Sequence, residues 1–165
     1  MSVSAVEPML LGRGLHYDEL PIGFRLRTMG RTLTETDLVA YINLTWFTEE
    51  VFVDTHPKSQ NALPARVVPG GLVYAFAEGL LTPSMQFTGL AFLGCEIDVK
   101  KPTVVGDTIH VEVEVIESRP TSSGNRGIVR TRNRVVNQRG ETVLVYTPLR
   151  LVRGSARAPT AGRDA

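Results

Sequence analysis

The sequence predicts an α+β fold in which a curved antiparallel sheet wraps around one long central helix. Two observations carry this prediction. Residues 67–81 form an apolar run opened by Gly70 and Gly71, and a helix that is apolar on nearly every side has to be covered. Four segments with strand-like patterns follow this run, and they are expected to supply the cover as a curled sheet.

The composition fits one soluble domain with a sizeable core: the chain has 165 residues, of which 42% are hydrophobic and 21% charged. The formal net charge of +1 excludes a large charged field that would recruit nucleic acid or a membrane surface. Cys95 is alone, which excludes an internal disulfide and a multi-thiolate metal site. The sequence shows no pattern of a secretory signal or a membrane span, so a cytoplasmic protein is expected. No metal or other cofactor is expected.

Three segments precede the central helix. Residues 1–21 are predicted to be a lead-in loop and residues 24–33 a first strand. Thr34, followed by Asp37 three residues later, resembles a capping box and predicts the start of a helix. The apolar face of that helix is expected to consist of Leu38, Val39, Tyr41, Ile42 and Leu44.

Residues 45–64 have no sustained periodicity and include two prolines, so they are predicted to be a functional loop. The central helix is expected to end at Thr82-Pro83. Strands are then predicted over residues 87–99, 108–118, 127–137 and 142–152 as a four-stranded meander, and residues 154–165 as a disordered tail. The domain is therefore expected to span residues 1–153.

One strand, a side helix, a buried helix and a meander of four strands together describe the hot-dog fold. A single unit of this kind leaves an edge strand and one end of the helix exposed. A homodimer or a larger oligomer is the expected way to cover them.

The order of these motifs resembles the MaoC-like, R-specific enoyl-CoA hydratase group of hot-dog proteins over roughly residues 17–152. The most specific matches are the Glu-x-Asp helix start at Glu35, the glycine that opens the central helix, and the Pro-x-x-x-Gly-Asp turn from Pro102 to Asp107. The resemblance implies a lyase of fatty acid metabolism that adds water to an acyl-CoA or acyl carrier protein thioester, or removes it.

The positions that carry acid–base chemistry in this family are changed here. The family's Asp falls on Phe47 and its His on Phe52, while its Asn-Pro pair falls on Glu49-Glu50. The His often found before the helix glycine is Pro69. Phenylalanine cannot carry a proton, so the resemblance transfers the fold but leaves the reaction to other residues.

Several residues are candidates for that chemistry. Gly70 and Gly71 can donate backbone N–H groups to a thioester oxyanion, or can simply allow close packing. Glu49, Glu50 and His56 can act as acid and base, although such groups are more often solvated. A further set of aromatic residues could line an acyl pocket, or belong to the core: Trp46, Phe47, Phe52 and Tyr74.

Glu78 supports a second interpretation. The spacing of Gly70-Gly71 and Glu78 resembles PaaI-like hot-dog thioesterases, in which an acid at this position activates water or attacks the thioester. Hydration or dehydration is the first hypothesis, a thioesterase using Glu78 the second, and a non-catalytic acyl-binding or partner subunit the third. Phosphate groups of the substrate could contact Arg66, Lys100 and Lys101.

Overall fold

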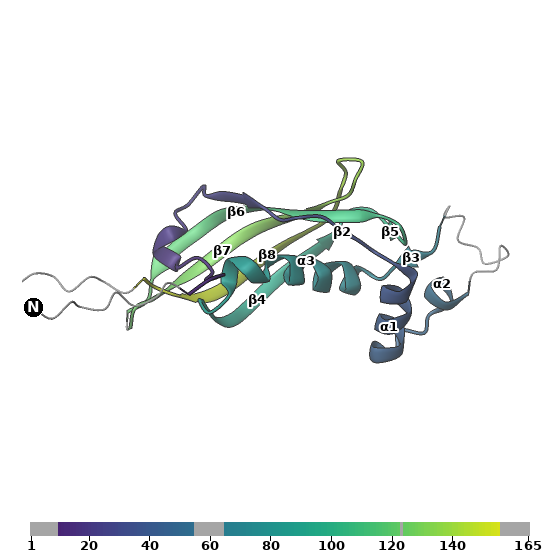
Figure 1. Cartoon of the computed structure of the whole chain (residues 1–165), viewed down its shortest axis with the longest axis horizontal. Helices are drawn as coiled ribbons and strands as arrows, with labels where there is room; N and C mark the ends of the chain where they lie inside the picture. The colour runs from purple at the N-terminus through teal and green to yellow at the C-terminus, as the bar shows by residue number, and fades with distance from the viewer. Residues whose placement is uncertain (1–9, 55–64, 123, 156–165) are drawn as a thin grey trace, which may run out of the picture.

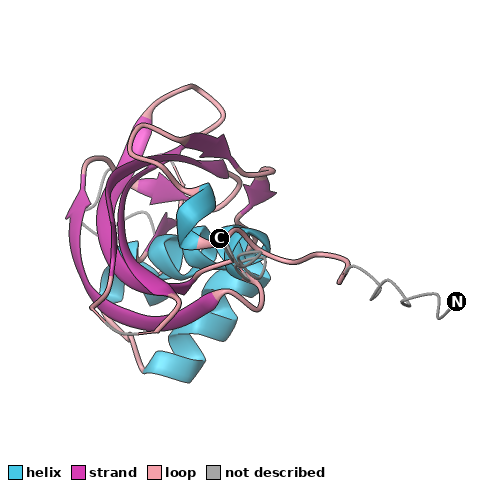
Figure 2. Ribbon diagram, turned by 90° about the vertical axis from the view of Figure 1, so that its left-hand side faces the viewer, coloured by secondary structure: helices cyan, strands magenta, loops and turns pink. Residues whose placement is uncertain are grey.

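The computed structural model describes residues 10–54, 65–122 and 124–155, and it is built from one long helix and a curved sheet (Figure 1). The helix α3 (Gly70–Met85) packs against the concave side of the sheet, which curls around it in the end-on view (Figure 2). The predicted architecture of a curved antiparallel sheet around a central helix is therefore confirmed.

The main sheet has the strand order β1-β6-β7-β8-β4, and every neighbouring pair is antiparallel. Its strands are β1 (Arg25–Arg27), β4 (Gly89–Val99), β6 (Thr108–Pro120), β7 (Arg126–Val136) and β8 (Thr142–Arg153). The predicted meander of four strands is wrong in one respect. Only β6, β7 and β8 follow one another, whereas β4 pairs with β8 at the opposite edge. The connection from β4 to β6 therefore crosses the end of the sheet.

The predicted first strand is divided in two, β1 and β2 (Arg31–Thr32), and both pair with β6. Arg27 lies opposite Glu112 and Arg31 opposite Ile109, so four steps along one strand match three along the other. This extra residue is the pattern of a β-bulge, which interrupts the ladder and turns side chains outward. Met29, within the interruption, is 78% exposed.

The helix predicted after Thr34 is confirmed as α1 (Glu35–Thr45). The Thr34 hydroxyl accepts the Asp37 N–H, and the Asp37 carboxylate accepts the Thr34 N–H at 2.9 Å, which completes the capping box. The predicted apolar face is only partly buried, because Leu38 and Ile42 are covered whereas Leu44 is 85% exposed. Within the predicted functional loop, the described part contains the short helix α2 (Glu50–Val53).

The central helix begins at Gly70 as predicted but ends later, because it continues through Pro83 to Met85. Pro83 lies in the last turn, where it removes one backbone hydrogen bond instead of interrupting the helix interior. The expectation that this helix is covered on every side is wrong for the described chain, since Ala75 and Gly79 are exposed. The sheet covers one face of α3, to which the helix contributes Leu72, Val73, Ala77 and Leu81.

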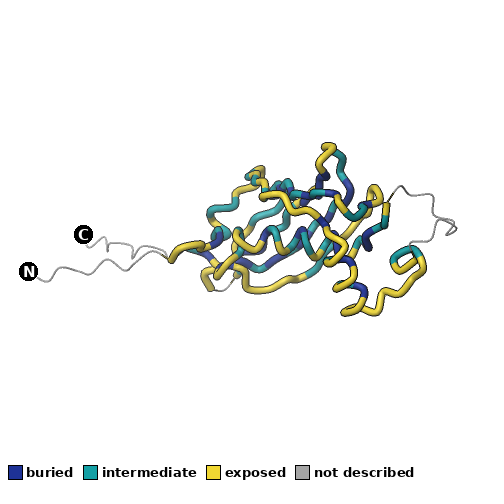
Figure 3. Tube along the Cα trace, turned by 45° about the vertical axis from the view of Figure 1, so that its right-hand side comes forward, coloured by how far each residue is buried: buried dark blue, intermediate teal, exposed yellow. Residues whose placement is uncertain are grey.

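The remaining elements lie near the two ends of α3. The lead-in segment contacts its C-terminal end, where the N–H groups of Gly14 and Leu15 donate to the carbonyls of Gln86 and Ser84, and β3 and β5 lie near its start. The lead-in segment contains one turn of 3-10 helix, η1 (Tyr17–Glu19), and β3 (Val67–Val68) pairs with β5 (Thr103–Val104) as a small separate sheet. β4 forms the outer edge of the main sheet and is exposed along most of its length (Figure 3). Its exposed apolar side chains are Leu90, Phe92, Leu93, Ile97 and Val99.

Candidate functional site

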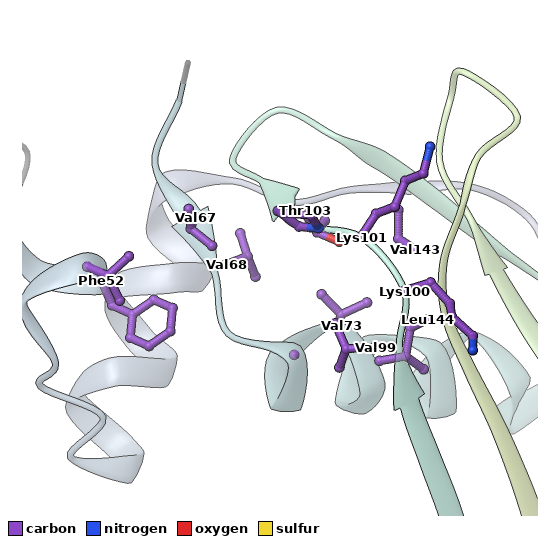
Figure 4. A pocket seen from close by; sticks show the side chains of 13 residues that line it. Phe52, Val67, Val68, Val73, Val99, Lys100, Lys101, Thr103, Val143 and Leu144 are labelled. Carbon is purple, nitrogen blue, oxygen red and sulfur yellow. The ribbon is translucent and has the colours of Figure 1, made fainter. Parts of the chain in front are cut away.

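A pocket of about 360 Å³ lies at the N-terminal end of α3 (Figure 4). Its walls come from α2, β3, the first turn of α3, the end of β4 with the segment that follows, and β8. Aliphatic side chains make up most of the lining, together with Phe52, Lys100, Lys101 and Thr103. A cavity that is mainly apolar and has a few polar groups is typical of a ligand site.

The start of α3 presents backbone donors beside this pocket. Pro69 occupies the N-cap position and makes no side-chain capping hydrogen bond. The N–H groups of Leu72 and Val73 both donate to the Pro69 carbonyl, at 3.0 and 3.2 Å. The amides of Gly70 and Gly71 precede this pattern, where a helix offers no internal acceptor, and they coincide with the positive end of the helix dipole.

The second of these glycines lies against a neighbour on α1. A Cβ atom placed on Gly71 would lie closer than 3.0 Å to the hydroxyl oxygen of Tyr41. At Gly70 the nearest atom to such a Cβ is a methyl carbon of Val99, at 3.1 Å. Tyr41 is a residue whose place at the site the sequence did not reveal, because its spacing marked it only as part of the apolar face of α1.

The two phenylalanines at the positions predicted for the family's dyad form an aromatic wall next to the helix start. The ring centroids of Phe47 and Phe52 are 5.4 Å apart, and those of Phe47 and Tyr41 are 6.4 Å apart. Phe52 lines the pocket and Phe47 is 40% exposed. Trp46, in a left-handed conformation at the C-cap of α1, is 85% exposed and lies outside the pocket lining.

Arg66 holds this wall in place. Its Nε and one terminal nitrogen donate to the backbone carbonyl of Phe52, at 3.0 and 2.6 Å, and the other terminal nitrogen pairs with Glu35. One guanidinium thereby ties α1 to α2 and fixes the backbone of Phe52 at the pocket. The Arg66 guanidinium, for which contact with substrate phosphate was predicted, is therefore already engaged in these contacts.

Two cations stand at the edge of the pocket. The N–H groups of Lys100 and Lys101 both donate to the Val143 carbonyl, at 2.9 and 3.1 Å, which fixes this segment against β8. The Lys100 ammonium pairs with Asp98, and that of Lys101 with Glu141 at 2.7 Å. The pKa of Glu141 is lowered to about 2, first by its hydrogen bond from Asn137 and then by those from Lys101 and Arg139.

The predicted acid–base residues are not gathered in the pocket. Glu49 is the N-cap of α2 and Glu50 its first residue; both are exposed, and neither belongs to the pocket lining. His56 lies outside the described residues. Within the described residues, no carboxylate or imidazole lines the pocket, and no group of three His, Cys, Asp or Glu side chains could hold a metal ion.

Glu78 has a partner that the sequence did not indicate. One terminal nitrogen of Arg150 donates to both of its carboxylate oxygens, at 2.7 and 2.5 Å. Next to this pair, the rings of Tyr74 and Tyr146 meet edge to face with centroids 5.1 Å apart. Burial, followed by the charge of Glu78, raises the pKa of Tyr74 to about 12 and raises that of Tyr146 as well. The only signal for Arg150 was a charged residue at a core-facing position of an alternating strand.

No helix within the described ranges is long and apolar enough to span a membrane.

Comparison with known proteins places the fold and the family. A model of the FAS1-like dehydratase domain region matches residues 21–145, most of the chain. The chain is 36% identical over 92 residues to a mesaconyl-CoA hydratase of Cereibacter sphaeroides; the match covers 55% of this chain and 27% of that protein.

Two solved structures show the same fold. The MaoC-like dehydratase from Rhodospirillum rubrum superposes with a TM-score of 0.77 at 24% identity, covering 87% of this chain and 99% of the other. Rv0216 from Mycobacterium tuberculosis, which has a double hot-dog fold, superposes with a TM-score of 0.76 at 19% identity, covering 94% of this chain and 50% of the other.

The fold is thus that of a hot-dog protein, and it has a mainly apolar pocket at the start of its central helix. The chain belongs to the FAS1-like dehydratase domain family. The fold and the family predicted from the sequence are therefore confirmed, and the assignment of catalytic residues stays a prediction.

Proposed function

We propose that this chain binds acyl thioesters of coenzyme A or of acyl carrier protein, and that it acts as a hydratase or dehydratase on them. The observation that carries this proposal is the apolar pocket built against an uncapped helix start. The thioester carbonyl oxygen would lie at the Gly70 and Gly71 amides, with the acyl chain among the aliphatic side chains. Membership of a dehydratase family and similarity to a mesaconyl-CoA hydratase support the same chemistry.

The helix start suits the charge that this reaction develops. When water adds to the β-carbon of an enoyl thioester, negative charge moves onto the thioester oxygen before the α-carbon takes up a proton. N–H donors that are already oriented at the positive end of a helix stabilise such an oxyanion. Lys100 and Lys101, at the edge of the pocket, would contact the phosphate groups of the carrier by exchanging their exposed ion pairs with Asp98 and Glu141 for them.

Proton transfer is assigned to Glu49 and Glu50. They lie on the α1–α2 segment between the two rings at the dyad positions, and Glu50 directly precedes Val51 and Phe52, which line the pocket. A carboxylate would take a proton from the attacking water, and the resulting acid would return one to the α-carbon. Because both glutamates are exposed in the single chain, this role requires them to turn toward the bound thioester.

A second candidate function is favoured by the contact between Phe47 and Phe52. If no other residues take over the acid–base role of the dyad, the chain is an acyl-binding partner of an active hydratase unit. The third candidate, a thioesterase using Glu78, is less well supported. Glu78 lies seven residues after Gly71, or about 10 Å along the helix axis, and Arg150 holds its carboxylate.

The test follows crotonyl-CoA with the purified protein, recording enoyl absorbance and free thiol together. Loss of the enoyl signal without thiol, abolished in Glu50→Gln or Glu49→Gln, supports the proposal. Activity that appears only after Phe47→Asp and Phe52→His are introduced together supports the binding partner instead. Thiol release that depends on Glu78 would refute both in favour of the thioesterase.

A further inference from the structure

The space between α3 and the sheet is interrupted by a layer made of Tyr74 and Tyr146. On α3 the lining of the pocket reaches only to Val73, and on β8 only to Leu144. The next core-facing residues along these elements are Tyr74 and Tyr146, whose rings meet at 88°. Tyr146 is 1% exposed, so this part of the interior is filled.

A second, separate cavity lies beyond this layer. It has a volume of about 50 Å³ and is lined mainly by aliphatic side chains, among them Leu81, Met85 and Val152. Arg150 also belongs to its wall, and through its ion pair with Glu78 it stands directly behind the tyrosines. The aromatic layer and the ion pair therefore separate two apolar spaces that lie between the same helix and the same sheet.

The ion pair makes the layer difficult to displace. Glu78 and Arg150 follow Tyr74 and Tyr146 by four residues each, and both carboxylate oxygens accept from the guanidinium. An acyl chain that pushed the rings aside would have to disturb this pair. Separating the two charges of a largely buried ion pair is costly, because each charge is then left without its partner.

We propose that the aromatic layer of Tyr74 and Tyr146 is the end wall of the acyl pocket and limits the chain to short acyl thioesters. This inference rests on the proposed function. From Gly70 to Tyr74 the helix rises four residues, or about 6 Å. Because carbon–carbon bonds are about 1.5 Å long, an extended acyl chain advances about 1.3 Å per carbon and reaches the layer about four or five carbons beyond the carbonyl carbon. Butanoyl and butenoyl groups fit, hexanoyl groups reach the wall, and octanoyl groups exceed it.

The experiment measures the dissociation constants of butanoyl-, hexanoyl-, octanoyl- and decanoyl-CoA for the wild type, Tyr74→Ala and Tyr74→Leu. Tyr74→Leu keeps an apolar side chain on the helix and guards against a failure of Tyr74→Ala to fold. Tyr146→Phe is the matched control, because it removes only the hydroxyl and keeps the buried ring that forms the layer. A buried methylene changes affinity about fourfold.

The wild type and Tyr146→Phe are expected to bind butanoyl-CoA and to gain nothing from carbons beyond the sixth. Tyr74→Ala and Tyr74→Leu are expected to bind octanoyl-CoA at least tenfold more tightly than the wild type does. Equal affinity gains per carbon up to decanoyl-CoA in the wild type would overturn the inference, as would unchanged length dependence in folded Tyr74 variants. If no acyl-CoA of any length binds to the wild type, the proposed function itself fails.

Discussion

Replacing Gly71 by alanine is the most direct test of how the helix start is built. In most helices an alanine is more stable than a glycine by about 0.5–1 kcal/mol, because glycine loses more backbone freedom on folding. Here the added Cβ would meet the hydroxyl oxygen of Tyr41 closer than 3.0 Å, so either the tyrosine or the first turn of α3 has to move. Gly71→Ala is therefore expected to destabilise the protein.

The magnitude follows from the neighbours of the tyrosine. Its ring packs against the core and against Phe47, so it cannot swing freely away, and overpacking of this kind costs about 1–3 kcal/mol. In a Tyr41→Phe background the clashing oxygen is absent, and the nearest remaining ring atom would lie 3.5 Å from the new Cβ, an ordinary contact. The same glycine substitution is then expected to be neutral or slightly stabilising, which gives a coupling energy of about 1.5–3 kcal/mol.

The assay is urea denaturation of the wild type, both single variants and the double variant, with the coupling energy taken from the cycle. Tyr41→Phe alone serves as the control for loss of the hydroxyl. A coupling energy near zero, with Gly71→Ala equally destabilising in both backgrounds, would show that the hydroxyl does not constrain position 71.

Three further predictions concern the ion pair, a buried acid and the exposed edge. Glu78→Gln leaves the largely buried Arg150 uncompensated and should lower the free energy of unfolding by about 2–4 kcal/mol in thermal melts, whereas an added Arg150→Met should recover part of the loss. The pKa of Asp107 is lowered overall: burial opposes this shift, and hydrogen bonds from the Val104 N–H and from two side chains outweigh it. Asp107→Asn should therefore cost about 2 kcal/mol at pH 7, and this difference should shrink as the pH falls below 3.8 through the folded-state pKa. If the expected oligomer forms through the exposed apolar side chains of β4, Ile97→Asp should shift it toward monomer in sedimentation velocity, and an unchanged sedimentation coefficient would contradict this use of the β4 edge.

Patterns that depend on neighbouring residues in the chain predicted the elements well. The capping box at Thr34 and Asp37, the alternation in β6 and the glycine start of α3 each reflect local geometry, and each appears as expected. The position of β4 could not be obtained in this way. Periodicity says that a segment is a strand but not which strand it pairs with, and β4 pairs with the last strand rather than with the next.

The site was harder to predict because its important contacts join distant parts of the chain. Nothing in the spacing of α1 indicates that Tyr41 lies against Gly71, and nothing near Glu78 indicates that its charge is held from β8 by Arg150. The sequence suggested that this acid could activate water or attack a thioester. The structure instead shows both of its carboxylate oxygens held by the Arg150 guanidinium.

Two phenylalanines at the predicted dyad positions favour binding of an apolar group over proton transfer. Under the proposed function, the uncapped helix start and the aliphatic lining would bind and polarise a thioester, while the two rings make the near wall of the pocket apolar. An apolar wall excludes water and lowers the local dielectric, which strengthens the attraction between an oxyanion and the helix amides. The same wall removes the groups that would move protons. Binding and polarisation are therefore local properties of the pocket, and proton transfer has to come from a group that approaches it from outside, which makes Glu49 and Glu50 the first residues to test.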